Sequence, residues 1–197
     1  KGLIRLLRGF RNVGDIREAV NGKELMKLIM QEEPDVALVD LHMPLMGGEE
    51  VCRWMESKYP RVKVVMLTME DSEEYIQHLI SLGAHAYISK SAQPEEVEQA
   101  INAVMEQDFY HNAMVTQALR NFTRQAGKTR KDTPQFTDRE VAIIKLICEE
   151  FTMKQIAKRL DISDKTVQNH RATIMDKMNV KNTAGLVKFA FTKGLIK

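Results

Sequence analysis

Residues 35–58 read DVALVDLHMPLMGGEEVCRWMESK, a short apolar run followed by a loop and an amphipathic stretch. The run at 35–41 is rich in aliphatic and β-branched residues and is bounded by turn signals, which predicts a buried strand. The stretch at 49–58 repeats apolar residues at intervals of three and four, which predicts a helix. A strand followed directly by a helix is half of the crossover unit that builds parallel sheets.

The same alternation continues on both sides of this unit. Strands are predicted at 16–20, 62–68 and 84–89, and helices at 2–10, 23–32, 72–82 and 94–105. Pro94 followed by two glutamates is a favoured first helical turn, and Gly83 lies where a helix should stop. Strands and helices in strict succession predict a doubly wound parallel sheet over residues 1–110.

The pattern changes after residue 110. Residues 111–134 are predicted to be a linker, because the segment 121–134 has few apolar residues, a glycine, a proline and mostly basic charges. Residues 135–197 are predicted to form an all-α domain, since they show no strand pattern. Four amphipathic helices are expected there, at 137–151, 153–160, 164–178 and 183–194. The first opens with a Thr-x-x-Glu capping box, Thr137 to Glu140.

Composition and charge exclude several classes of protein. A content of 44% hydrophobic and 28% charged residues excludes a wholly disordered or fibrous chain. No apolar stretch is long enough to span a bilayer, and two distant cysteines exclude a disulfide scaffold, so we expect a protein of the reducing cytoplasm with no membrane contact. The net charge is −7 over residues 1–110, +4 over 111–134 and +5 over 135–197. This asymmetry favours an acidic regulatory half and a basic half that binds a polyanion.

Three polar residues stand where the predicted strands end. Asp40 ends the run 36–39, Thr68 ends the run 64–67, and Lys90 follows the run 86–89. The carboxyl ends of parallel strands meet at one edge of the sheet, where doubly wound folds bind their ligands. A carboxylate, a hydroxyl and an ammonium at this edge suit a phosphoryl group carried on Asp40. Each of the three residues, taken singly, is more often a solvated strand terminus.

Local sequence favours the phosphoryl interpretation. The segments DLHMP at 40–44 with Gly48, MLT at 66–68 and GAHAYISK at 83–90 resemble the receiver domain of bacterial response regulators. This resemblance covers nearly all of residues 1–110. It implies a flavodoxin-like (CheY-like) α/β fold.

The resemblance also implies a role for each residue at the sheet edge. Asp40 would accept the phosphoryl group, Thr68 would be the switch hydroxyl, and Lys90 would pair with the phosphate. Tyr87 would be the aromatic that turns inward after phosphorylation. A Mg²⁺ ion would lie beside Asp40, held by that carboxylate, by the backbone carbonyl of His42 and by an acidic pair at the end of the first strand.

The acidic pair is a departure from the family pattern. The sequence opens at Lys1 on a predicted helix, and no such pair precedes it. In the strand order 2-1-3-4-5 the first strand lies between the second and the third. We therefore expect the natural protein to extend upstream by a strand and loop that carry the remaining metal ligands. The alternative is a degenerate receiver that binds a protein partner without phosphate.

Residues 153–178 have the layout of a helix-turn-helix. A short helix ending at Leu160 is followed by a tight turn at 161–163 and by a second helix from Asp164. One face of the second helix is apolar, and the other carries amides and cations. A recognition helix needs this division, because one face packs on the domain and the other enters a DNA groove. From periodicity alone, a generic helical hairpin is the alternative.

Sequence detail favours the DNA-binding interpretation. Residues 135–197 resemble the LuxR-type four-helix DNA-binding domain in the segments FTDRE at 136–140, IAKRL at 156–160, IS at 162–163, TV at 166–167 with His170, IMDKM at 174–178 and GL at 194–195. With the receiver in front, the chain resembles a NarL/FixJ-family transcriptional response regulator. The resemblance implies double-stranded DNA and a sensor histidine kinase as partners.

The recognition helix is predicted to divide its side chains between bases and phosphates. Gln168 stands where the family often carries a lysine, and its amide favours adenine over guanine. Base contacts are predicted for Gln168, Asn169 and Ala172. Phosphate contacts are predicted for Lys154, Lys165, Thr166, Arg171, Lys177 and Lys181.

The last predicted helix carries an apolar stripe that exceeds what three small helices need to cover. Its members are Leu186, Val187, Ala190 and Phe191. The surplus predicts a contact between two copies of the chain in a homodimer, as the resemblance also implies. Packing within the chain is the alternative.

Three functions are compatible with the parts of this sequence. The first is a transcription factor that a kinase controls through Asp40, and the second is an adaptor with constitutive DNA binding and a vestigial Asp40. The third, a hydrolytic enzyme, is disfavoured because no second general acid or activated nucleophile accompanies Asp40. We therefore expect a regulator rather than an enzyme.

Overall fold

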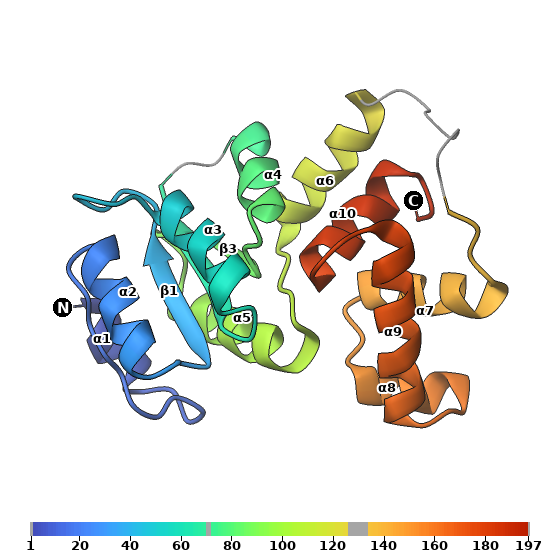
Figure 1. The fold of residues 1–197 in the computed structure, drawn as a ribbon, viewed down its shortest axis with the longest axis horizontal. Helices are drawn as coiled ribbons and strands as arrows, with labels where there is room; N and C mark the ends of the chain where they lie inside the picture. The colour runs from blue at the N-terminus through green and yellow to red at the C-terminus, as the bar shows by residue number, and fades with distance from the viewer. Residues whose placement is uncertain (1, 70–71, 126–133, 197) are drawn as a thin grey trace.

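The computed structural model describes residues 2–69, 72–125 and 134–196. The first half of the chain forms a parallel α/β layer, and the second half forms a group of helices (Figure 1). The strands are β1 (Val36–Asp40), β2 (Lys63–Thr68) and β3 (Ala86–Ser89). They are parallel and lie in the order β1-β2-β3, with Asp40 opposite Leu67 and Thr68 opposite Ser89.

Helices cover both faces of this sheet. They are α1 (Gly2–Leu7), α2 (Gly22–Gln31), α3 (Gly48–Lys58), α4 (Glu73–Ser81) and α5 (Pro94–Gln107). Helices α1 and α5 share one buried cluster with Val65, and helices α2, α3 and α4 share the other with Met66. Neighbouring residues of a strand point to opposite faces, so β2 contributes to both cores. The doubly wound α/β fold is confirmed.

The predicted strand at 16–20 is wrong. The structure shows no strand over these residues, and the side chain of Val20 is 72% exposed. A strand needs the backbone of a neighbouring strand to complete its hydrogen bonds. In the expected strand order that neighbour is the first strand, which is not among the described residues.

Part of the predicted linker at 111–134 is a helix, α6 (Ala113–Gln125). Val115, Ala118 and Leu119 form its buried stripe at helical spacing, which our prediction overlooked because the basic charges further along suggested a linker. Gln77 of α4 donates a hydrogen bond to the carbonyl of Ala118 at 2.8 Å. Residues 126–133 of the predicted linker lie outside the described residues.

The second half of the chain folds into the four helices that periodicity predicts. They are α7 (Asp138–Cys148), α8 (Met153–Leu160), α9 (Asp164–Met178) and α10 (Thr183–Thr192). The capping box of Thr137 and Glu140 forms as predicted. Asp161 ends α8 with a left-handed φ of 53°, and Ser163 accepts the Thr166 N–H at 3.1 Å, so the turn between α8 and α9 is short. No described helix is both long and apolar enough to cross a bilayer.

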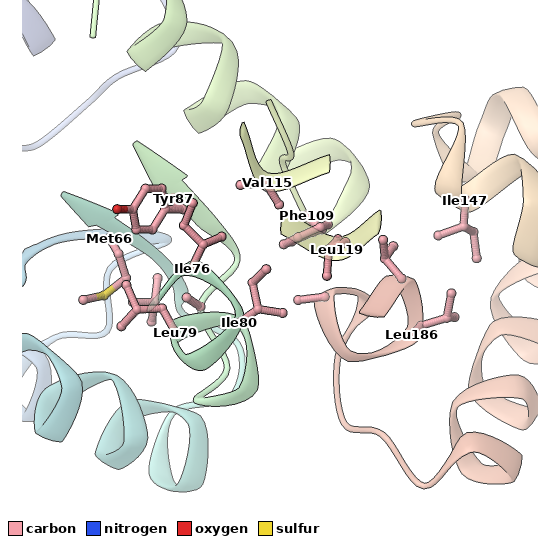
Figure 2. Packing of buried hydrophobic residues seen from close by; sticks show 14 of the residues in the cluster. Met66, Ile76, Leu79, Ile80, Tyr87, Phe109, Val115, Leu119, Ile147 and Leu186 are labelled. Atoms are coloured by element: carbon pink, nitrogen blue, oxygen red, sulfur yellow. The ribbon is translucent and has the colours of Figure 1, made fainter. Parts of the chain in front are cut away.

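The two halves of the chain share one apolar core. Ile80 of α4, Leu119 of α6 and Leu186 of α10 belong to a single buried cluster, part of which Figure 2 shows. The stripe predicted as a dimer contact is buried inside the chain, in the residues Leu186, Val187, Ala190 and Phe191. In this arrangement the stripe packs within the chain. Helix α6 covers the part of the stripe that the other three helices of the domain would leave exposed. Contact between two copies stays a prediction that requires this arrangement to open.

Candidate functional site

The carboxyl edge of the sheet brings Asp40 and Lys90 together. The Lys90 ammonium donates a hydrogen bond to Asp40 Oδ2 at 2.5 Å, and the His42 N–H donates to Asp40 Oδ1 at 3.0 Å. The side chains of Asp40 and Lys90 are each 36% exposed, so the carboxylate can be reached from solvent. A carboxylate held beside a cation at an open sheet edge is suited to accept a phosphoryl group.

Backbone hydrogen bonds and a close approach position this pair. The Lys90 N–H donates to the carbonyl of Thr68 at 2.8 Å, which fixes the residue after β3 to the end of β2. Helix α3 begins at Gly48, where an added Cβ would lie 2.5 Å from the carbonyl oxygen of Asp40. Only glycine allows α3 to start so close to the Asp40 backbone.

The two predicted switch residues lie inside the molecule. The side chains of Thr68 and Tyr87 are both buried, at the end of β2 and in β3 respectively. Figure 2 shows Tyr87 in the apolar cluster that includes Met66 of β2 and Ile76 of α4. Tyr87 thus already occupies the inward position that the resemblance associates with phosphorylation.

Helix α9 divides its side chains as a recognition helix would. Val167 and Ile174 are buried, which leaves the opposite face of the helix to solvent. The three predicted base-contact residues are exposed: Gln168, Asn169 and Ala172. Among the predicted phosphate contacts, Lys154 and Lys165 are exposed, while the Thr166 hydroxyl lies 2.8 Å from the Ser163 hydroxyl at the helix start.

Three predicted phosphate contacts have carboxylate partners in the chain instead. Lys177 donates to both oxygens of the buried Glu140 at 2.7 Å, and this bond holds the Glu140 pKa below its ordinary value. Lys177 therefore supports the packing of α9 on α7, and its contact with a DNA phosphate stays a prediction. Lys181 lies 3.3 Å from Glu56 of the α/β half. Arg171 is bonded to Asp108 at the end of α5.

Asp108 is a functional candidate that sequence reasoning missed. It follows α5 with a left-handed φ of 71°, and its carboxylate also bonds Lys63 and Thr183. Nothing in the local sequence around residue 108 distinguishes this aspartate from a solvated helix end. Its partners come from three distant segments, which only the fold brings together.

Comparisons with known proteins agree with this geometry. Residues 1–102 match the response regulator receiver domain, and residues 134–190 match the bacterial regulatory proteins of the luxR family. The chain belongs to the response regulators with a LuxR-type DNA-binding domain. This response regulator is thus a DNA-binding transcription regulator of a two-component system, in a family of regulators rather than typical enzymes.

Named relatives cover most of this response regulator. It is 36% identical to the oxygen regulatory protein NreC of Staphylococcus carnosus (strain TM300), over 90% of this chain and 85% of that protein. It is 34% identical to NreC of Staphylococcus aureus (strain JH9), over 92% and 86%. The fold is similar to that of RcsB from Salmonella enterica serovar Typhimurium bound to promoter rprA, with a TM-score of 0.55, 20% identity and coverage of 98% and 92%.

Receiver domains generally use Mg²⁺ for phosphorylation. In the part of this response regulator that the structure describes, no three or more Asp, Glu, His or Cys side chains are grouped to hold a metal. Asp40 brings one carboxylate, and that carboxylate already binds Lys90 and the His42 N–H. The described residues alone therefore provide too few ligands for a divalent cation. The roles of Asp40 and of the His42 carbonyl as metal ligands stay predictions.

Proposed function

We propose that a sensor histidine kinase transfers a phosphoryl group to Asp40, and that this transfer controls how the helical domain binds DNA. The observation that supports the proposal is the contact of Asp40 with Lys90 at the open edge of the sheet. The same chain presents Gln168 and Asn169 on the exposed face of α9. An acceptor and a reader of bases in one chain suit a phosphorylation-controlled transcription factor.

The transfer uses the Asp40 carboxylate as nucleophile. One carboxylate oxygen attacks the phosphorus of a phosphohistidine on the kinase, the P–N bond breaks, and the histidine nitrogen leaves with the electron pair and takes up a proton. The Lys90 ammonium, 2.5 Å from Asp40, then lies next to the new phosphoryl oxygens and offsets their charge. Thr68, at the end of β2, would supply its hydroxyl to the phosphate.

The buried cluster provides a route from Asp40 to the DNA-binding domain. Thr68 ends β2 and Tyr87 lies in β3. Tyr87 shares a buried cluster with Ile76 of α4, and α4 packs against both α6 and α10. A shift of α4 that weakens this packing frees α10 and the recognition helix. Phosphate then acts by favouring one of two arrangements of the domains.

A footprint on genomic DNA, with and without phosphorylation, tests this function. The arrangement described here buries α10 and binds Arg171 to Asp108, so we expect the phosphorylated protein to bind DNA more tightly. The concentration that gives half protection should fall by about 5- to 150-fold, the usual range for coupled sites. Identical footprints would instead support constitutive DNA binding with a vestigial Asp40.

The base-reading role of Gln168 has a separate test. Gln168→Ala removes the amide that can bond adenine, and should cost about 1 to 3 kcal/mol at one base position and relax specificity there. Binding to a set of duplexes with single base changes measures this loss. Lys165→Ala is the contrasting variant, because loss of a phosphate contact weakens all sequences equally. If Gln168→Ala behaves in the same uniform way, Gln168 does not read a base.

We also propose that the DNA-bound form is a homodimer. The name of one solved structure describes two RcsB dimers bound to two parallel DNAs. In this chain, opening of the domains would expose the stripe of Leu186 and Phe191 on α10. Two exposed stripes can cover each other about a two-fold axis, which suits paired half-sites on DNA.

A further inference from the structure

One carboxylate, that of Asp108, joins the two halves of the chain. Its Oδ1 accepts a hydrogen bond from Lys63 of β2 and lies 3.9 Å from Nε2 of His85, both in the receiver. Its Oδ2 accepts bonds from Arg171 of α9 and, at 2.9 Å, from the hydroxyl of Thr183, the first residue of α10. Each oxygen of the carboxylate therefore serves one domain.

The surroundings of Asp108 make these bonds strong. The side chains of Asp108 and Arg171 are 19% and 25% exposed, and Thr183 is buried. Burial acts to raise the Asp108 pKa, but the attraction of Arg171 and Lys63 outweighs it and the pKa lies below its ordinary value. The carboxylate is thus ionised at neutral pH, and water screens it less than it screens a surface pair.

Arg171 directs two of its three guanidinium nitrogens at Asp108 and Thr183. Its Nη2 donates to Asp108 and to the Thr183 hydroxyl, and its Nε lies 3.2 Å from the same hydroxyl. A guanidinium binds a carboxylate and a phosphate with the same planar set of donors. Arg171 is a cation of the recognition helix that we expect to bind a DNA phosphate, so Asp108 and the phosphate compete for its donors.

We propose that Asp108 is an electrostatic latch that occupies Arg171 in place of a DNA phosphate. The latch makes domain docking and DNA binding compete for one side chain. It rests on the proposed function, because it names the contact that phosphorylation of Asp40 must break. By linkage, DNA weakens docking by the same factor by which docking weakens DNA binding.

Asp108→Asn in the full chain, without any phosphate donor, tests the latch. Asparagine accepts a left-handed φ readily, so the end of α5 keeps its conformation while the carboxylate loses its charge. We expect the Kd for a mixed-sequence duplex of about 30 base pairs at low salt to fall by at least about fivefold. Hydrogen exchange should become faster in residues 183–192, since α10 is released.

Two single variants separate the latch from other effects. Glu106→Gln removes an equal charge from an exposed site two residues before Asp108, and should change the Kd much less. Lys63→Gln breaks only the bond inside the receiver, and should leave the Kd within about twofold of wild type. If Asp108→Asn matches Glu106→Gln in both measurements, or if Lys63→Gln matches Asp108→Asn, the latch is refuted.

A double variant tests the competition itself. Asp108→Asn with Arg171→Gln opens the domains but removes the guanidinium that DNA should gain, so the tighter binding of the single variant should be lost. Equal binding by the single and double variants overturns the role of Arg171. None of these measurements involves Asp40, so a failed latch leaves phosphorylation control standing, and a failed footprint test leaves these affinities interpretable.

Discussion

Asp40→Asn is expected to abolish phosphate incorporation from acetyl phosphate and Mg²⁺ in the full-length protein. The substitution replaces the carboxylate that contacts Lys90 with an amide of the same shape, and an amide is too weak a nucleophile to attack phosphorus. Intact-protein mass spectrometry measures the phosphorylated fraction, which should fall from a measurable value to none.

Asp35→Asn is the matched control for this experiment. Asp35 is an exposed aspartate beside the amino end of β1, so the same substitution is made at the opposite end of one strand. It should leave phosphate incorporation unchanged, because Asp35 lies away from Lys90. Phosphate retained as an acyl phosphate in Asp40→Asn would show that another carboxylate is the acceptor.

Leu119→Ala is expected to have the largest effect on stability. Leu119 of α6 is buried among α4 and α10, and Figure 2 shows it between Ile80 and Leu186. Truncation of a buried leucine leaves a cavity and costs about 2 to 5 kcal/mol. The free energy of unfolding, measured by urea denaturation with fluorescence of the single tryptophan, Trp54, should fall by this amount or the transition should split in two.

Met114→Ala provides the comparison on the same helix. The side chain of Met114 is 36% exposed, so its loss should change the free energy of unfolding much less. A partial release of α10 in Leu119→Ala should also strengthen DNA binding without phosphate. Equal stabilities of the two variants would mean that α6 does not hold the domains together.

Leu119 and Asp108 hold the two domains together at different places. Leu119 contributes apolar packing near the centre of the shared core, and Asp108 contributes charge at its edge. The apolar contact is not directional, whereas the carboxylate selects the guanidinium of Arg171. Changes to the apolar packing should therefore weaken the contact between the domains by degrees. Loss of the Asp108 charge should break the specific bond to Arg171.

Local chemistry made several elements predictable from sequence. Helices α8 and α9 have the predicted bounds, because each combines apolar residues at helical spacing with a cap residue directly before it. These caps are Thr152 for α8 and Ser163 for α9. The meeting of Asp40 with Lys90 was predictable for a different reason. Parallel strands place their carboxyl ends at one edge, so the strand pattern alone brings the two residues together.

Predictions that depended on a distant neighbour were less reliable. The segment 16–20 has a strand pattern but no paired strand in the described residues, and residues 113–125 form a helix where basic composition suggested a linker. Lys177, Lys181 and Arg171 were all predicted to bind phosphate because they are cations near α9. Each lies against a carboxylate that is more than 30 residues away in sequence.

The sequence alone predicts the order of strands and helices, the place of Asp40 at the sheet edge, the exposed amides of α9 and the two-domain plan. Periodicity, caps and strand ends are local properties, which is why these features are predictable. The burial of the α10 stripe and the bond between Asp108 and Arg171 were decided only by the tertiary structure. Both arise where segments that are far apart along the chain come into contact, and a sequence pattern does not say which of several possible partners covers an apolar face or neutralises a charge.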